Sequence, residues 1–117
     1  MIELYNGDCQ AFLSNYSGER FDAVITDPPY ASGGATLSER SASTSQKYTA
    51  TKKACPFPDF MGDQMDARSW LHMMADVLAL ARVQCHDGAV LVVFCDWRQI
   101  PLLTDAVQWA GWQWRGT

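Results

Sequence analysis

The hydrophobic and polar positions of the first thirty residues alternate in short blocks. Residues 2–6 place Ile, Leu and Tyr among polar residues and predict a short strand. Residues 9–16 predict a short helix for which Asp8 is the N-cap. Residues 21–26 (FDAVIT) are apolar and rich in β-branched side chains, and they predict a buried strand.

The second half of the chain shows the same alternation. Apolar residues at helical spacing predict an amphipathic helix from Asp66 to about Cys85, ended by Asp87-Gly88. Residues 89–95 (AVLVVFC) are apolar throughout, as expected of a central parallel strand covered on both faces. A helix is then predicted to about residue 110, and residues 112–115 predict a further strand.

This order of strands and helices predicts an α/β fold with a mostly parallel sheet. The 117 residues are 48% hydrophobic and 19% charged, which fits a single globular domain over residues 1–117. The first residues, MIELYNGDCQ, show no signal-peptide pattern, and the longest apolar run is too short for a membrane span. We therefore expect a cytoplasmic protein that does not contact a membrane.

The stretch from about residue 31 to residue 65 differs in kind, because its period is neither 2 nor 3.6. Nine Ser/Thr residues lie between Ala31 and Lys52, and we expect a long, flexible surface loop. The charged side chains between residues 31 and 58 give a net charge of +3, which leaves −7 on the rest of a chain of net charge −4. The positive side chains are Arg40, Lys47, Lys52 and Lys53.

The four cysteines are too widely spaced for a zinc knuckle, so we expect reduced thiols and no metal site. The net charge of −4 also excludes a small protein that binds nucleic acid by bulk positive charge.

The segment Asp27-Pro28-Pro29-Tyr30 directly follows the predicted strand FDAVIT. Ligands of α/β sheets bind beyond the carboxyl ends of strands, and the two prolines stiffen the chain in an extended form. Such a corner presents the Asp27 carboxylate and the Pro28 carbonyl side by side, next to the Tyr30 ring. Two acceptors and a ring suit the exocyclic amino group of a planar base; an ordinary strand-ending turn is the alternative.

This segment carries a family resemblance. VITDPPY resembles the catalytic motif of DNA methyltransferases that methylate amino groups with S-adenosylmethionine. Asp27 at its first position resembles the adenine-N6 members, whereas the cytosine-N4 members more often carry Ser there. The later stretches PDFMGD, CDWRQIP and GWQWRG resemble phage and prophage members, and the opening strand with Gly7-Asp8 resembles members with permuted motif order.

The resemblance implies a Rossmann-like fold and methyl transfer to N6 of an adenine flipped out of DNA. It gives catalytic roles to Asp27, Pro28, Pro29 and Tyr30. Asp8 matches a position that contacts the adenine of S-adenosylmethionine, and Cys9 and Asp27 are expected beside the cofactor. DNA is then the expected partner, with phosphate contacts from Arg40, Lys47, Lys52 and Lys53; a solvated linker is the alternative for that loop.

The sequence also departs from the family, because it contains no glycine-rich cofactor loop and no target-recognition segment. We therefore expect the N-terminal portion of such an enzyme, with an incomplete fold that associates through an exposed sheet edge. A catalytically inactive remnant and a cytosine-N4 methyltransferase stay open as alternatives. Methylation of RNA or of protein glutamine is a third possibility; the glutamine enzymes resemble an Asn-Pro-Pro-Tyr variant, so Asp27 argues against that substrate.

Two groups of residues, each containing a tryptophan, have competing interpretations. Asp96 and Trp97 end the predicted strand over residues 89–95, and they either line the substrate site or serve in capping and packing. Trp70, Met73 and Met74 are interpreted as helix core, with a recognition surface as the alternative.

Overall fold

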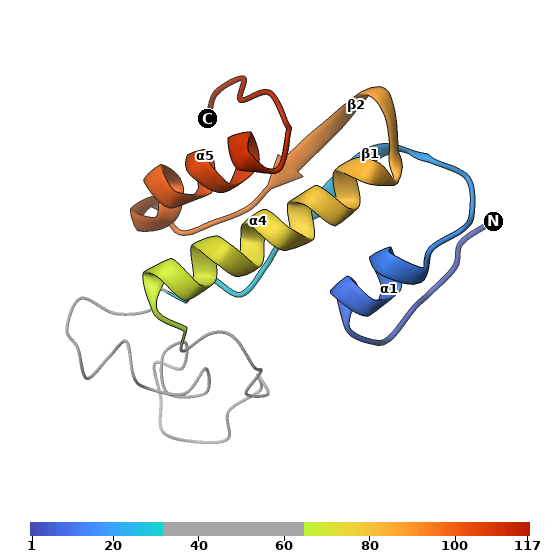
Figure 1. Cartoon of the computed structure of the whole chain (residues 1–117), viewed down its shortest axis with the longest axis horizontal. Helices are drawn as coiled ribbons and strands as arrows, with labels where there is room; N and C mark the ends of the chain where they lie inside the picture. The colour runs from blue at the N-terminus through green and yellow to red at the C-terminus, as the bar shows by residue number, and fades with distance from the viewer. Residues whose placement is uncertain (32–64) are drawn as a thin grey trace.

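The computed structural model describes residues 1–31 and 65–117, which form two parallel strands and a set of helices (Figure 1). The elements in chain order are α1 (Cys9–Asn15), β1 (Phe21–Thr26), α4 (Ala67–Val83), β2 (Cys85–Val93), the 3-10 helix η1 (Trp97–Gln99) and α5 (Ile100–Trp109). The chain is therefore mixed α/β with a parallel strand pair, as predicted. The loop expected over about residues 31–65 lies outside the described residues except at its two ends.

Side-chain caps begin two of the helices where the sequence predicts them. The Asp8 carboxylate accepts a hydrogen bond from the Ala11 N–H at 2.8 Å. The Asp66 carboxylate accepts from the N–H groups of Arg68 and Ser69, both at 3.0 Å, and from the Ser69 hydroxyl at 2.7 Å. Each cap satisfies donors that the first turn of a helix leaves unpaired, so both helix starts are locally encoded.

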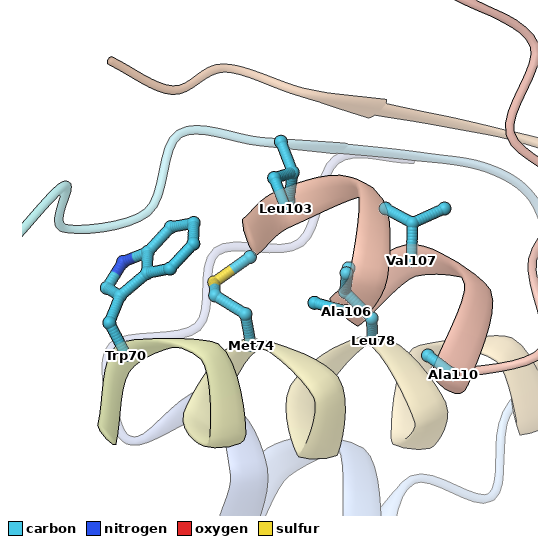
Figure 2. Packing of buried hydrophobic residues seen from close by; sticks show 7 residues of the cluster. All are labelled: Trp70, Met74, Leu78, Leu103, Ala106, Val107 and Ala110. Carbon is cyan, nitrogen blue, oxygen red and sulfur yellow. The ribbon is translucent and has the colours of Figure 1, made fainter. Parts of the chain in front are cut away.

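The core lies between α4 and α5, which pack side by side with α1 on the other side of α4 (Figures 1 and 2). Its buried side chains recur at helical spacing, and they are Trp70, Met74, Leu78, Leu103, Ala106, Val107 and Ala110. Leu91, Val93 and Cys95 pack against this cluster from the sheet side. The core position predicted for Trp70 and Met74 is confirmed, and Met73 is partly buried against the same cluster.

Two predicted strands are wrong. Residues 2–6 are irregular, and Ile2 and Leu4 are almost fully exposed. Residues 112–115 are irregular too, because the Trp112 indole N–H donates to the Leu78 carbonyl at 2.9 Å and draws the tail back onto α4. A strand needs a neighbour for its backbone groups, and among residues 1–31 and 65–117 neither segment has one.

The predicted boundaries around β2 are also wrong. Helix α4 ends at Val83, two residues before the predicted end at about Cys85, and β2 runs from Cys85 to Val93 rather than from residue 89 to residue 95, so Asp87-Gly88 lies within the strand. The pairing register shifts between the Phe21–Cys85 and Ala23–Val90 pairs, and Gly88, with φ +88°, lies inside this irregular stretch. Nor does β2 have both faces covered, since Val90, Val92 and Phe94 are exposed. No helix in the described part of the chain is both long and apolar enough to cross a bilayer.

Candidate active site at the carboxyl end of the sheet

The segment Asp27–Tyr30 leaves the carboxyl end of β1, at the edge of the sheet where β2 also ends. The Phe94 N–H donates to the Thr26 carbonyl at 2.9 Å, which joins the two strand ends. Asp96 follows β2 at this same edge and caps η1 by accepting from the Arg98 N–H at 2.9 Å. Loops at this edge of a parallel sheet are where ligands bind in α/β proteins.

The Asp27 side chain is exposed, and a neighbouring hydroxyl holds it in place. Tyr30 Oη donates to Asp27 Oδ1 at 2.6 Å, a short hydrogen bond of the charge-assisted kind. Oδ1 is thereby engaged, and no described residue donates to Oδ2. A stacking ring is the role predicted for Tyr30 from the sequence, and the positioning role of its hydroxyl was not predicted.

Two buried side chains hold the backbone of the corner. Trp70 Nε1 donates to the Pro29 carbonyl at 2.5 Å, and Gln99 Nε2 donates to the Tyr30 carbonyl at 3.0 Å. Trp70 is fully buried and Gln99 is 4% exposed. Pro28 and Pro29 have no backbone N–H groups, so they cannot donate to a neighbouring strand. Side-chain donors from α4 and η1 fix the segment instead, by binding its carbonyl groups.

The Pro28 carbonyl is an acceptor of the turn that these contacts do not use. No residue within 1–31 and 65–117 donates a hydrogen bond to it. The sequence predicts the Asp27 carboxylate and the Pro28 carbonyl as acceptors, and no described residue donates to Asp27 Oδ2 or to the Pro28 carbonyl. An amino group with two hydrogens matches this pair of acceptors.

The corner ends in an unusual backbone conformation. Ala31 has φ +54°, in the left-handed region that residues with a Cβ rarely adopt. This conformation costs about 1–2 kcal/mol relative to the right-handed one. Backbone strain of this kind concentrates at functional sites, where packing around it maintains the geometry. Ala31 packs against the α4–α5 core, which supplies that support.

The other candidate residues divide into two that the structure describes, Asp8 and Cys9, and four that lie outside the described residues. Asp8 and Cys9 are exposed at the start of α1, and no hydrogen bond or ion pair between described residues joins them to the Asp27–Tyr30 segment. Asp8 uses one carboxylate oxygen in its cap, so its other oxygen is the one that could accept from a cofactor. The four basic residues of the predicted DNA-binding loop, Arg40, Lys47, Lys52 and Lys53, lie outside the described residues.

Two cysteines and the metal-binding side chains were the other candidates for chemistry in the described residues. Burial raises the pKa of the Cys85 and Cys95 thiols, so both favour the unreactive protonated form. No group of three or more His, Cys, Asp or Glu side chains in residues 1–31 and 65–117 is arranged to hold a metal ion.

Two cavities lie elsewhere on the described surface. One of about 850 Å³ is bounded by β2, α5 and the tail after it, with Val92, Val107 and Trp114 in its lining. Another of about 460 Å³ lies between Leu71 and Trp109. Neither lining includes Asp27–Tyr30, where Asp27 is exposed and Pro28, Pro29 and Tyr30 are half-buried.

No family model matches this chain, and searches of curated proteins and of solved structures found no match either. Function is therefore inferred from the geometry of Asp27–Tyr30 and from the sequence resemblance of that segment.

Proposed function

We propose that this chain forms the catalytic part of an S-adenosylmethionine-dependent DNA methyltransferase that acts on the N6 amino group of adenine. The observation that carries the proposal is the pair of acceptors at the strand end. Asp27 Oδ2 and the Pro28 carbonyl are unused by the described protein, while Tyr30, Trp70 and Gln99 hold the groups around them. This arrangement supports recognition of an amino group that carries two hydrogens.

The chemistry follows from where those hydrogens go. When the amino group donates one hydrogen to Asp27 Oδ2 and the other to the Pro28 carbonyl, its lone pair is withdrawn from conjugation with the ring and becomes nucleophilic. The methylated nitrogen must then lose a proton, and the Asp27 carboxylate is the base within reach. Most of the rate enhancement would come from positioning and from fixed dipoles.

The methyl donor makes separate demands on the protein. S-adenosylmethionine supplies an electrophilic methyl group on a sulfonium. In the described residues, the exposed Asp8 carboxylate fits an adenosine amino or hydroxyl group through its uncapped oxygen. The target adenine has to leave the duplex to reach a corner set among β1, α4 and η1.

A methylation assay tests this proposal. The full chain is incubated with tritiated S-adenosylmethionine and a duplex of mixed sequence, and the DNA is digested to nucleosides and separated. We expect N6-methyladenine, and a loss of about 10²- to 10⁴-fold in rate for Asp27→Ala. Asp105→Ala, which removes an exposed carboxylate from α5, is the matched control and should keep full activity.

Other products would redirect or reject the proposal. N4-methylcytosine would identify a cytosine-N4 enzyme that uses the same acceptor pair. A wild-type chain that transfers no methyl group, or an Asp27→Ala variant as active as wild type, would reject it. The first of these two results would favour an inactive remnant.

A further inference from the structure

Trp97 is an exposed aromatic residue in the short helix η1, which binds the acceptor corner through Gln99. Its side chain is 73% exposed, although it belongs to η1, which begins three residues after Phe94 at the end of the sheet. A tryptophan normally contributes a large buried apolar area, so such exposure leaves a flat ring without its usual burial.

The neighbours of Trp97 hold the ring in position. The Arg98 guanidinium lies 5.3 Å from the ring centroid, in the range of a cation–π contact. Asp96 in turn lies 3.6 Å from the Arg98 guanidinium and caps the Arg98 N–H. With one face of the ring next to Arg98, a side chain that is 73% exposed presents the other face to solvent.

The same short helix is joined directly to the acceptor corner. Gln99, two residues after Trp97, donates its side-chain N–H to the Tyr30 carbonyl at 3.0 Å. Successive Cα atoms are about 3.8 Å apart, so the Cα atoms of Trp97 and Gln99 are at most about 8 Å apart. Trp97 therefore belongs to the turn that holds the acceptor corner through Gln99.

We propose that Trp97 stacks on a nucleobase that flanks the target in the DNA strand presented to Asp27. This inference rests on the proposed function and adds a binding residue to it. Every base offers a π face, and stacking on an aromatic side chain is sequence-tolerant. Asp96 partly neutralises Arg98, so the contribution of this turn comes from ring stacking more than from attraction to phosphate.

The position of Trp97 favours a base over a protein surface. The exposed aliphatic side chains of the sheet, including Ile25 and Val92, lie on the open face of β1 and β2, where a protein partner would bury the most apolar area. Trp97 instead follows the strand end, in the turn that binds the acceptor corner through Gln99.

The test measures binding of the full chain to a fluorescently labelled single-stranded DNA of twelve nucleotides by anisotropy. Trp97→Ala should weaken binding by about 5- to 150-fold, the range that corresponds to one lost base stack. The matched control is Trp109→Ala on α5, which removes a side chain that is 70% exposed and should change the affinity by less than about twofold. Trp97→Phe should retain most of the affinity, because it keeps a ring for stacking.

The salt dependence of binding provides a second measurement. Loss of a stacking contact should leave the slope of log Kd against log salt unchanged, whereas loss of a phosphate contact would lower it by about one. Equal binding by wild type and Trp97→Ala, no binding of the DNA by wild type, or equal losses for Trp97→Ala and Trp109→Ala would each overturn the inference. A purified protein captured through Trp97 with no effect on DNA binding would also overturn it.

Binding and methylation are measured separately on the same protein, so the two proposals can fail independently. Trp97-dependent binding without any methylation would reject the enzyme and keep the stacking residue. Methylation and DNA affinity that are both unchanged in Trp97→Ala would reject the stacking role and keep the enzyme.

Discussion

The two faces of the β1–β2 sheet differ, although the same strands supply both. Leu91 and Val93 pack against the α4–α5 core, whereas Ile25 is 71% exposed and Phe94 is 55% exposed on the open face. Side chains alternate between the faces of a strand, so a run of apolar residues supplies both faces equally. The difference shows that an apolar strand sequence does not specify which face is buried. The helices that pack on the sheet determine which face becomes the core.

The packed face also positions the candidate active site. Trp70 belongs to the α4–α5 core and donates to the Pro29 carbonyl. The core and the acceptor corner therefore share the Trp70 side chain. Substitutions in the core are expected to affect both stability and catalysis. Substitutions on the open face are expected to affect neither strongly.

The largest effect on stability is expected for Leu78→Ala, in the α4–α5 core that covers the packed face of the sheet. Leu78 is fully buried, so its truncation leaves a cavity and should lower the free energy of unfolding by about 2–5 kcal/mol. Val83→Ala, at an exposed position on the same helix, should change it by less than about 0.5 kcal/mol. Urea denaturation followed by circular dichroism measures both, and similar losses for the two variants would contradict the division between faces.

Trp70→Phe distinguishes the packing role of Trp70 in the core from its hydrogen bond to the acceptor corner. The substitution keeps a large ring but removes the N–H that binds the Pro29 carbonyl, which should cost about 1–3 kcal/mol of stability and reduce methylation. Trp112→Phe removes a similar indole donor, from the Leu78 carbonyl, and should destabilise the fold without a specific loss of activity. Equal rates for the two variants, compared at a temperature where both are folded, would mean that Trp70 does not position the corner.

Neighbouring valines in β2 compare the two faces directly. Val93→Ala and Val92→Ala delete the same groups from side chains that point to opposite faces. We expect losses of about 1–2 kcal/mol for Val93→Ala and less than about 0.5 kcal/mol for Val92→Ala. Thermal denaturation distinguishes them, and a larger loss at Val92 would show that the open face is covered in solution.

The smallest effect is expected at the exposed cap of α4. Hydrogen bonds from the Ser69 side chain and the Ser69 and Arg68 N–H groups lower the pKa of Asp66 below its ordinary value of 3.8. Because the folded state favours the carboxylate, this stabilisation is complete above pH 3.8 and is lost as the pH falls through the lowered pKa. The melting temperature of Asp66→Asn should lie slightly below that of wild type at neutral pH, and this difference should disappear in acid. A difference in melting temperature that does not depend on pH would show that the charge of Asp66 is not its cause.

Local sequence patterns determined a definite part of this protein. The caps at Asp8 and Asp66 depend on contacts between residues a few positions apart. The strand Phe21–Thr26 and the buried stripe of α4 are visible in the spacing of apolar residues, so the local pattern suffices to predict them although distant elements complete their packing. The acceptor corner belongs to the same class, since two prolines after a strand constrain it locally.

Tertiary structure alone decided the rest. The donors that hold the corner, Trp70 and Gln99, lie 41 and 69 residues along the chain from the carbonyls they bind, and no local pattern encodes such a pairing. Residues 2–6 and 112–115 have strand-like patterns and form no strand, because a strand is stable only when a neighbour pairs with its backbone. Which face of β2 is covered depends likewise on where α4 and α5 pack, and that is settled by long-range contacts.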